Sequence, residues 1–295
     1  MKEALVGNPS AYVQRLILGV ELAKLREQTG LSLKDIEREL EFDQSWMSRV
    51  EHGERGMKAR DVRSLLDLFG QHTSIEEGQR EELLSLARAG FSGKPDWWRK
   101  LSGKGLKPKF DLLIAAEAGA RTISHWRSQI LPGILQTDAY AQAVIEATDV
   151  EGVVDVGGRI DIRRARQEII TRKENPVTLQ VILDEAVLHR QVGGPEVMKE
   201  QLQRLAELSG LPNVKIQVLP FAAGAHPAVN GDFVLLVFKA NDDLGMVYLE
   251  TATSGLVLQS QHEVRRYSRT YGMLQATALS PAKSASLIAS TAKEL

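Results

Sequence analysis

Three side chains early in the chain carry hydrogen-bonding groups that suit the edges of DNA bases. They are Gln44, Ser45 and Arg49, within residues 44–52. A glutamine amide can form two hydrogen bonds with adenine, and an arginine can do the same with guanine. The side chains expected to contact phosphates, and so to set the register on the duplex, are Lys34, Ser48, Lys58 and Arg60. This set predicts a segment that contacts bases in a groove of DNA.

A second group of polar side chains raises the question of catalysis. It consists of Asp184, Glu185, His189, Arg190, His226, Asp232 and Glu250. Glu185 and His189 are spaced to share one helix face, but the HExxH pattern of a zinc pair is absent, as are a Walker phosphate loop and a Gly-x-Ser-x-Gly elbow. We therefore expect no enzyme, no metal and no cofactor. As a candidate ligand or partner site we retain Glu185, Arg190, His226 and Glu250.

Short helices with clear boundaries must position the first group. One helix face carries leucines at i, i+4 and i+7, namely Leu18, Leu22 and Leu25. Gly30 ends that helix. Ser32 precedes Asp35 by three residues, which is the spacing of a capping box and marks the start of a second helix. Asp43 can cap the next helix, residues 44–52, on which Met47 and Val50 point inward. A fourth helix carries Val62, Leu65, Leu66 and Phe69. The second and third helices have the separation of a helix-turn-helix pair, although a helical bundle that binds protein remains an alternative.

The segment LREQTGLSLKDIERELEFDQSWMSRVEHGERG resembles the XRE-type repressor family. That family closes its motif with Ser-Arg-hydrophobic-Glu-x-Gly, which here corresponds to residues 48–53. The resemblance implies DNA binding, with base contacts from Gln44, Ser45 and Arg49. The family usually has a small residue where Glu37 stands and a glycine where Glu41 stands.

The remaining chain predicts a connector and a second domain. Residues 76–110 contain a short helix at 79–89 and then a basic linker with Trp97 and Trp98. The tryptophans could stack along DNA, but we favour the interpretation that they anchor the linker on the second domain. Residues 111–295 predict an α+β domain. Its expected strands are residues 177–183, 214–219, 233–238 and 246–249, and its expected helices include 112–129, 159–174, 197–208, 263–276 and 281–293. The fold class is thus a mainly α helix-turn-helix bundle over residues 1–75 plus an α+β C-terminal domain.

The second domain also resembles a known regulator family. The segments that carry the resemblance are ILPGILQTDAYAQAVI, LDEAVLHRQVGG, VLPFAAGAHPAVNGDFVLLVF, VYLET and EVRRYSRTYGMLQATALSPAKSASLIA. They are similar to the C-terminal domain of actinobacterial antitoxin-like, or WhiJ-like, regulators. This resemblance implies a developmental or secondary-metabolism regulator whose partner is a small protein encoded by an adjacent gene.

The composition limits the class of protein but does not identify its binding partner. The chain has 295 residues, no cysteine, 43% hydrophobic residues and a net charge of −1. The lack of cysteine excludes disulfides and thiolate sites and fits a reducing compartment. No run approaches the ~18 to 20 apolar residues of a membrane span, and the start lacks a signal-peptide pattern. We therefore expect a cytoplasmic protein, and the net charge does not itself indicate nucleic acid.

Three functional hypotheses follow from the sequence. The first is a homodimeric regulator that binds a palindromic operator, with recognition helices about 34 Å apart, and responds to a protein partner. The second is a regulator that responds to a small molecule in the C-terminal domain, with residues 222–232 and Glu250 near the site. The third is an enzyme or a protein-interaction adaptor with little or no DNA binding.

Overall fold

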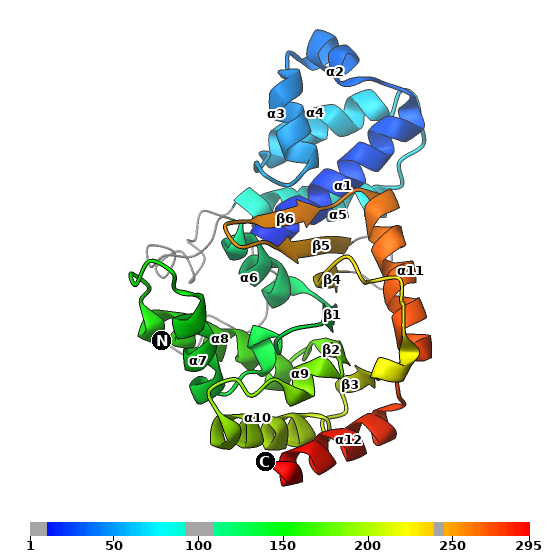
Figure 1. The fold of residues 1–295 in the computed structure, drawn as a ribbon. Coiled ribbons are helices and arrows are strands. Elements are labelled where there is room, and N and C mark those ends of the chain that lie inside the picture. The colour runs from blue at the N-terminus through cyan, green and yellow to red at the C-terminus, as the bar shows by residue number, and fades with distance from the viewer. Residues whose placement is uncertain (1–10, 92–108, 239–244) are drawn as a thin grey trace. The chain divides into compact units, whose positions relative to one another are not determined.

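A computed structural model describes residues 11–91, 109–238 and 245–295, so Trp97 and Trp98 lie outside the described residues. The described chain divides into two compact units, one ending at residue 91 and the other beginning at residue 109. The regular elements of the first unit are all helices, and the second unit is an α+β fold around one sheet (Figure 1). This architecture confirms the predicted fold class.

The first unit is a bundle of short helices with a shared apolar core. The helices are α1 (Ala11–Thr29), α2 (Leu33–Leu40), α3 (Gln44–Glu51), α4 (Ala59–Phe69) and α5 (Glu77–Phe91). The apolar positions predicted to face inward are buried, among them Leu22, Ile36, Met47, Val50, Leu65 and Phe69. Burial of each large side chain contributes about 1.5 to 3 kcal/mol before the entropy of ordering is counted. Helix α5 packs against α1 and α4, so it belongs to this core.

Caps encoded in the sequence define where α2 and α3 begin. The Ser32 hydroxyl accepts a hydrogen bond from the Asp35 backbone N–H, and the Asp35 carboxylate accepts one from the Ser32 N–H, which completes the predicted capping box. The hydrogen bonds from Ser32 lower the pKa of Asp35. The Asp43 carboxylate caps α3 through the Trp46 N–H. Between the two helices, Glu41 has a φ of 59°, the left-handed conformation that glycine adopts most readily.

The second unit is built around a six-stranded mixed sheet of order β3-β2-β1-β4-β5-β6. Its strands are β1 (Thr122–Arg127), β2 (Thr178–Asp184), β3 (Val214–Leu219), β4 (Phe233–Val237), β5 (Gly245–Glu250) and β6 (Gly255–Leu258). Strands β1, β2 and β3 are parallel, whereas β4, β5 and β6 continue the sheet in antiparallel pairing. Strand β1 therefore lies in the middle, between β2 and β4.

Helices cover both faces of this sheet. They are α6 (Phe110–Gly119), α7 (Asp138–Thr148), α8 (Val156–Thr171), α9 (Ala186–His189), α10 (Pro195–Leu208), α11 (Gln261–Thr277) and α12 (Pro281–Glu294), with 3-10 turns at Gly133–Leu135 and Phe221–Ala223. Figure 1 shows α6, α7 and α8 on one side of the sheet and α11 on the other. On the α11 side, Trp126, Phe233, Tyr271 and Leu274 form an apolar cluster.

The helix predicted over residues 112–129 is wrong in its second half. Helix α6 ends at Gly119, and residues 122–127 form the central strand β1. Ala120, Ile123 and Trp126 recur every three residues and so imitate a helix face. A strand buried on both faces lacks the apolar-polar alternation that would have identified it, and four consecutive residues of β1 are buried.

The described residues lack two features, a membrane-spanning helix and a cluster of metal ligands. No helix among them combines the length and the apolar character needed to cross a bilayer. Those residues also contain no group of three or more His, Asp or Glu side chains placed to hold a metal ion.

Candidate nucleic-acid interface and ligand pocket

Helix α3 separates its apolar and polar residues between two faces. Met47 and Val50 are buried against the bundle, whereas Gln44, Ser45 and Arg49 are exposed. The Arg49 Nε atom donates to the Ser45 carbonyl, 3.3 Å away on the same helix. The three predicted base-contacting side chains thus share the solvent face of one short helix, which is the arrangement that contact with a major groove requires.

Gln44 is tied to the preceding helix. Its Nε2 atom donates to Oε2 of Glu37 on α2 at 2.5 Å. The bond restricts the amide at the first position of α3 before any DNA is present. It also places a carboxylate beside the exposed face of α3.

A partly buried ion pair links α3 to α1. Arg26 Nε lies 2.7 Å from Glu51 Oε1, and Arg26 Nη2 lies 3.1 Å from Glu51 Oε2. This hydrogen-bonded pairing raises the pKa of Arg26. Gly53 follows with a φ of 69°, and a Cβ atom there would lie 2.7 Å from the Leu16 Cα. The Glu and Gly that close the sequence motif therefore have structural roles: they hold α3 close to the first helix.

The predicted phosphate contacts are distributed around the same helix pair. Lys34 is exposed on the first turn of α2, and Ser48 is half-buried on α3. Lys58 and Arg60 are exposed at the start of α4, where Lys58 Nζ lies 5.8 Å from the Phe91 ring centre and Arg60 pairs with Asp61 at 3.0 Å. Their assignment to phosphates stays a prediction.

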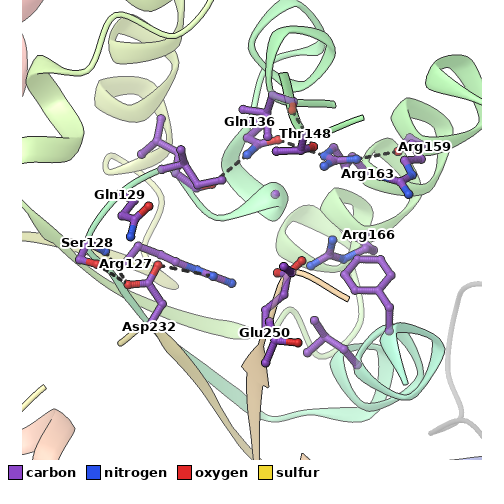
Figure 2. Close-up of a pocket in the computed structure, with 18 of the residues that line it drawn as sticks. Arg127, Ser128, Gln129, Gln136, Thr148, Arg159, Arg163, Arg166, Asp232 and Glu250 are labelled. Atoms are coloured by element: carbon purple, nitrogen blue, oxygen red, sulfur yellow. Dashed lines mark hydrogen bonds and ion pairs between the residues drawn. The ribbon is translucent and has the colours of Figure 1, made fainter. Parts of the chain in front are cut away.

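The C-terminal unit contains a cavity of about 440 Å³ whose lining includes both polar and apolar side chains. Figure 2 shows side chains from β1, α8 and the end of β5 arranged around it. The apolar part of the lining consists of Phe110, Leu113, Ile130, Leu131, Val144 and Ile162. The volume falls within the range of small-molecule sites.

Four arginines line this cavity: Arg127, Arg159, Arg163 and Arg166. The last three lie on α8 at i, i+4 and i+7, so they share one helix face. The sequence predicted a helix over residues 159–174 but no site on it. Arginines at that spacing, on an amphipathic helix that also carries Ile162 and Ile169, were the signal that could have found the site.

Two of these arginines have carboxylate partners. Arg166 is buried and makes a bidentate pair with Glu117 of α6, with Nε–Oε2 and Nη2–Oε1 distances of 2.6 and 2.8 Å. Arg127 lies 3.8 Å from Asp232, whose carboxylate also accepts hydrogen bonds from the Ser128 N–H and hydroxyl. Figure 2 shows the contacts of Asp232 with Arg127 and Ser128.

Arg163 has a different environment. Its Nε atom donates to Gln136 Oε1 at 3.0 Å, and its Nη1 atom donates to the Arg159 carbonyl at 3.2 Å. Burial, together with the charges of Arg166 and Arg159, lowers the pKa of Arg163 to about 10, and Glu250 opposes that shift. Arg163 therefore remains a cation at neutral pH, but one held in unfavourable surroundings.

The residues that the sequence suggested as a ligand or partner site do not lie together in one site. Glu250 lines the cavity, as does Asp232. Arg190 lies beside it, because its Nε donates to the carbonyl of the lining residue Gln129. Glu185 instead accepts from the Phe221 N–H and lies 3.8 Å from His189. His226 accepts from the Ala228 N–H in its own loop and packs edge-on against Trp126.

Comparison with known protein families agrees with this division of the chain. Residues 17–81 match the model of a helix-turn-helix domain. Residues 110–290 match a domain of unknown function, DUF5753. No curated protein and no solved structure matches the chain. The helix-turn-helix match supports a DNA-binding regulator, whereas the second match assigns no activity.

Proposed function

This chain belongs to the DUF5753 family, and on that premise we propose that it is a sequence-specific transcriptional regulator whose C-terminal unit receives the signal. The observation that carries the proposal is the exposure of Gln44, Ser45 and Arg49 on one face of α3 while Met47 and Val50 anchor the opposite face. This distribution suits direct contact with base edges.

The protein acts on a palindromic or pseudo-palindromic operator as a homodimer. Two copies of α3 then enter successive major grooves about 34 Å apart. The compartment is the cytoplasm, where the operator is, and the protein works by binding and not by catalysis. The XRE-type and actinobacterial resemblances noted in the sequence support these finer assignments.

Two kinds of signal fit the C-terminal unit. The antitoxin-like resemblance supports a small protein partner encoded by an adjacent gene. The cavity supports a small molecule, because it combines apolar side chains with a few convergent polar groups. Either signal changes operator affinity only if it binds one arrangement of the recognition helices more tightly than another. The size of the change cannot exceed that difference in binding free energy.

A binding profile across the genome tests the proposal. The tagged full-length protein is cross-linked and its sites are recovered, and the purified protein is then titrated onto these sites at two salt concentrations. Sharp peaks with a two-fold motif and a salt-dependent affinity are expected. Binding that is equally tight on unrelated DNA, or absent from all recovered sites, would favour the adaptor hypothesis.

A further inference from the structure

The cavity in the C-terminal unit has more cationic than anionic side chains in its lining. The lining contains four arginines, Arg127, Arg159, Arg163 and Arg166, and two carboxylates, Asp232 and Glu250. Two carboxylates outside the lining also act on these arginines, since Glu117 pairs with Arg166 and Asp149 interacts with Arg159. An excess charge in a partly enclosed site is costly unless a counter-charge joins it.

The arginines of the cavity differ in their hydrogen-bond partners. The bidentate bond of Arg166 to Glu117 and the contact of Arg127 with Asp232 use carboxylates. In the part of the chain that the structure describes, the hydrogen bonds of Arg163 go to neutral oxygens of Gln136 and Arg159. Its guanidinium therefore lies at the cavity wall with its charge balanced only at a distance.

The same cavity also offers contacts for a carbon skeleton. Phe110, Leu113 and Val144 contribute apolar surface to it, and the Phe110 ring lies 5.2 Å from the guanidinium carbon of Arg166. A ligand that filled the space would place an apolar body against these side chains and present an acidic group to α8. Arginine forms short, charge-assisted and often bidentate hydrogen bonds to carboxylate and phosphate oxygens.

We infer that the cavity binds a small organic anion, with a carboxylate or phosphate group on Arg163 and an apolar body in contact with Phe110, Leu113 and Val144. The inference rests on the proposed role of the C-terminal unit as the receiver of a signal, and it names the chemical class of that signal. Binding itself requires no DNA.

The test uses a pair of probes that differ in charge. Full-length protein without DNA is titrated with 8-anilinonaphthalene-1-sulfonate, an aromatic monoanion, and with N-phenyl-1-naphthylamine, which lacks the sulfonate. We expect the anion to bind at one site per chain and about ten-fold or more tighter than the neutral probe. The reason is that only the anionic probe can accept a charge-assisted hydrogen bond from an arginine. Equal affinity for the two probes, or no binding of the anion, would overturn the inference.

Neighbouring arginines on α8 give a matched pair of variants. Arg163→Met should weaken binding of the anionic probe about ten-fold or more. Arg164→Met removes an exposed arginine that pairs with Asp138 outside the cavity lining and should leave the affinity unchanged. If Arg163→Met does not fold, as judged by near-ultraviolet circular dichroism, Arg163→Lys should retain binding and Arg159→Met should lose it. Wild-type affinity in Arg163→Met or Arg159→Met would contradict the inference.

Competition identifies the acidic group. Sodium hexanoate should displace the anionic probe if the natural ligand is a carboxylate, and sodium phosphate if it is a phosphate ester. Displacement by neither would overturn the assignment to these two groups. Probe binding in a protein that fails to recover operator sites would refute the proposed regulator while leaving the anion site intact, so the two failures are distinguishable.

Discussion

Glu117 and Arg166 form a two-point ion pair inside the C-terminal unit, with exposed side-chain fractions of only 1% and 5%. The pair joins α6 to α8 and so holds the helix that carries Arg159 and Arg163 against α6. Breaking such a pair leaves a charge that is neither hydrated nor balanced. The arrangement of the cavity therefore depends on a carboxylate in α6.

The first prediction concerns this pair. Glu117→Gln should destabilise the protein by about 3 to 5 kcal/mol, because Arg166 stays buried without its counter-charge. The double variant Glu117→Leu with Arg166→Met should recover most of that loss, since both charges are removed together. Urea unfolding of the three proteins measures the differences. A double variant no more stable than Glu117→Gln would show that the pair is not the source of the effect.

The second prediction concerns pH and His125. This histidine is completely buried on β1, and burial together with the charges of Arg127 and Arg166 lowers its pKa well below the usual value. As the pH falls below about 6.5, His125 binds a proton in the unfolded chain but not in the folded chain. The free energy of unfolding therefore decreases by up to about 1.4 kcal/mol per pH unit.

Urea unfolding between pH 7.5 and 5.5 tests this dependence. His125 lies between Val181 and Val234 on the neighbouring strands, where leucine is a suitable apolar replacement. In His125→Leu, the slope of the unfolding free energy against pH should fall by the contribution of one proton. The exposed His262→Gln serves as the control. Identical slopes in wild type and His125→Leu would mean that His125 does not titrate on unfolding.

The third prediction concerns the turn between α2 and α3. Glu41→Gly should stabilise the first unit by about 1 kcal/mol, because Glu41 occupies the left-handed region at φ 59°, where a side chain is disfavoured. Glu41→Ala keeps the Cβ atom and should show little gain. Thermal unfolding compares the two, and an equal gain in both would assign the effect to the lost charge.

The fourth prediction concerns the bond between Glu37 and Gln44. Glu37→Ala should raise affinity for all DNA, because a carboxylate beside α3 is removed. It should also reduce discrimination at the base that Gln44 contacts by up to about ten-fold, since the amide is no longer held. Dissociation constants on matched and substituted operators measure both effects. Glu39→Ala, exposed on the same helix, should leave the discrimination unaltered.

The fifth prediction separates base contacts from phosphate contacts. Arg49→Ala should lose about 1 to 3 kcal/mol at its cognate base and relax specificity there. Lys58→Ala should weaken all sequences alike and reduce the slope of affinity against salt by about one. Titrations at several salt concentrations distinguish the two. Wild-type behaviour of Arg49→Ala on the operator would mean that α3 does not contact bases as proposed.

The sequence by itself determined the helices of the first unit and which side of α3 is exposed. Met47 and Val50 are buried where the spacing predicts, and Ser32 and Asp43 cap the helices that they precede. These features are predictable because caps and helix faces depend on residues three or four positions apart. The positions of strands β2 to β5 were also predicted, from short β-branched segments.

Only the tertiary structure decided the centre of the sheet and the cavity. Strand β1 is a strand because β2 and β4 pair with it on both sides, although its own spacing resembles a helix. Arg127, Arg163 and Glu250 lie on different elements, separated by long stretches of sequence, and meet around one space. Strand pairing and helix packing between distant segments create that space, and no local pattern encodes such contacts.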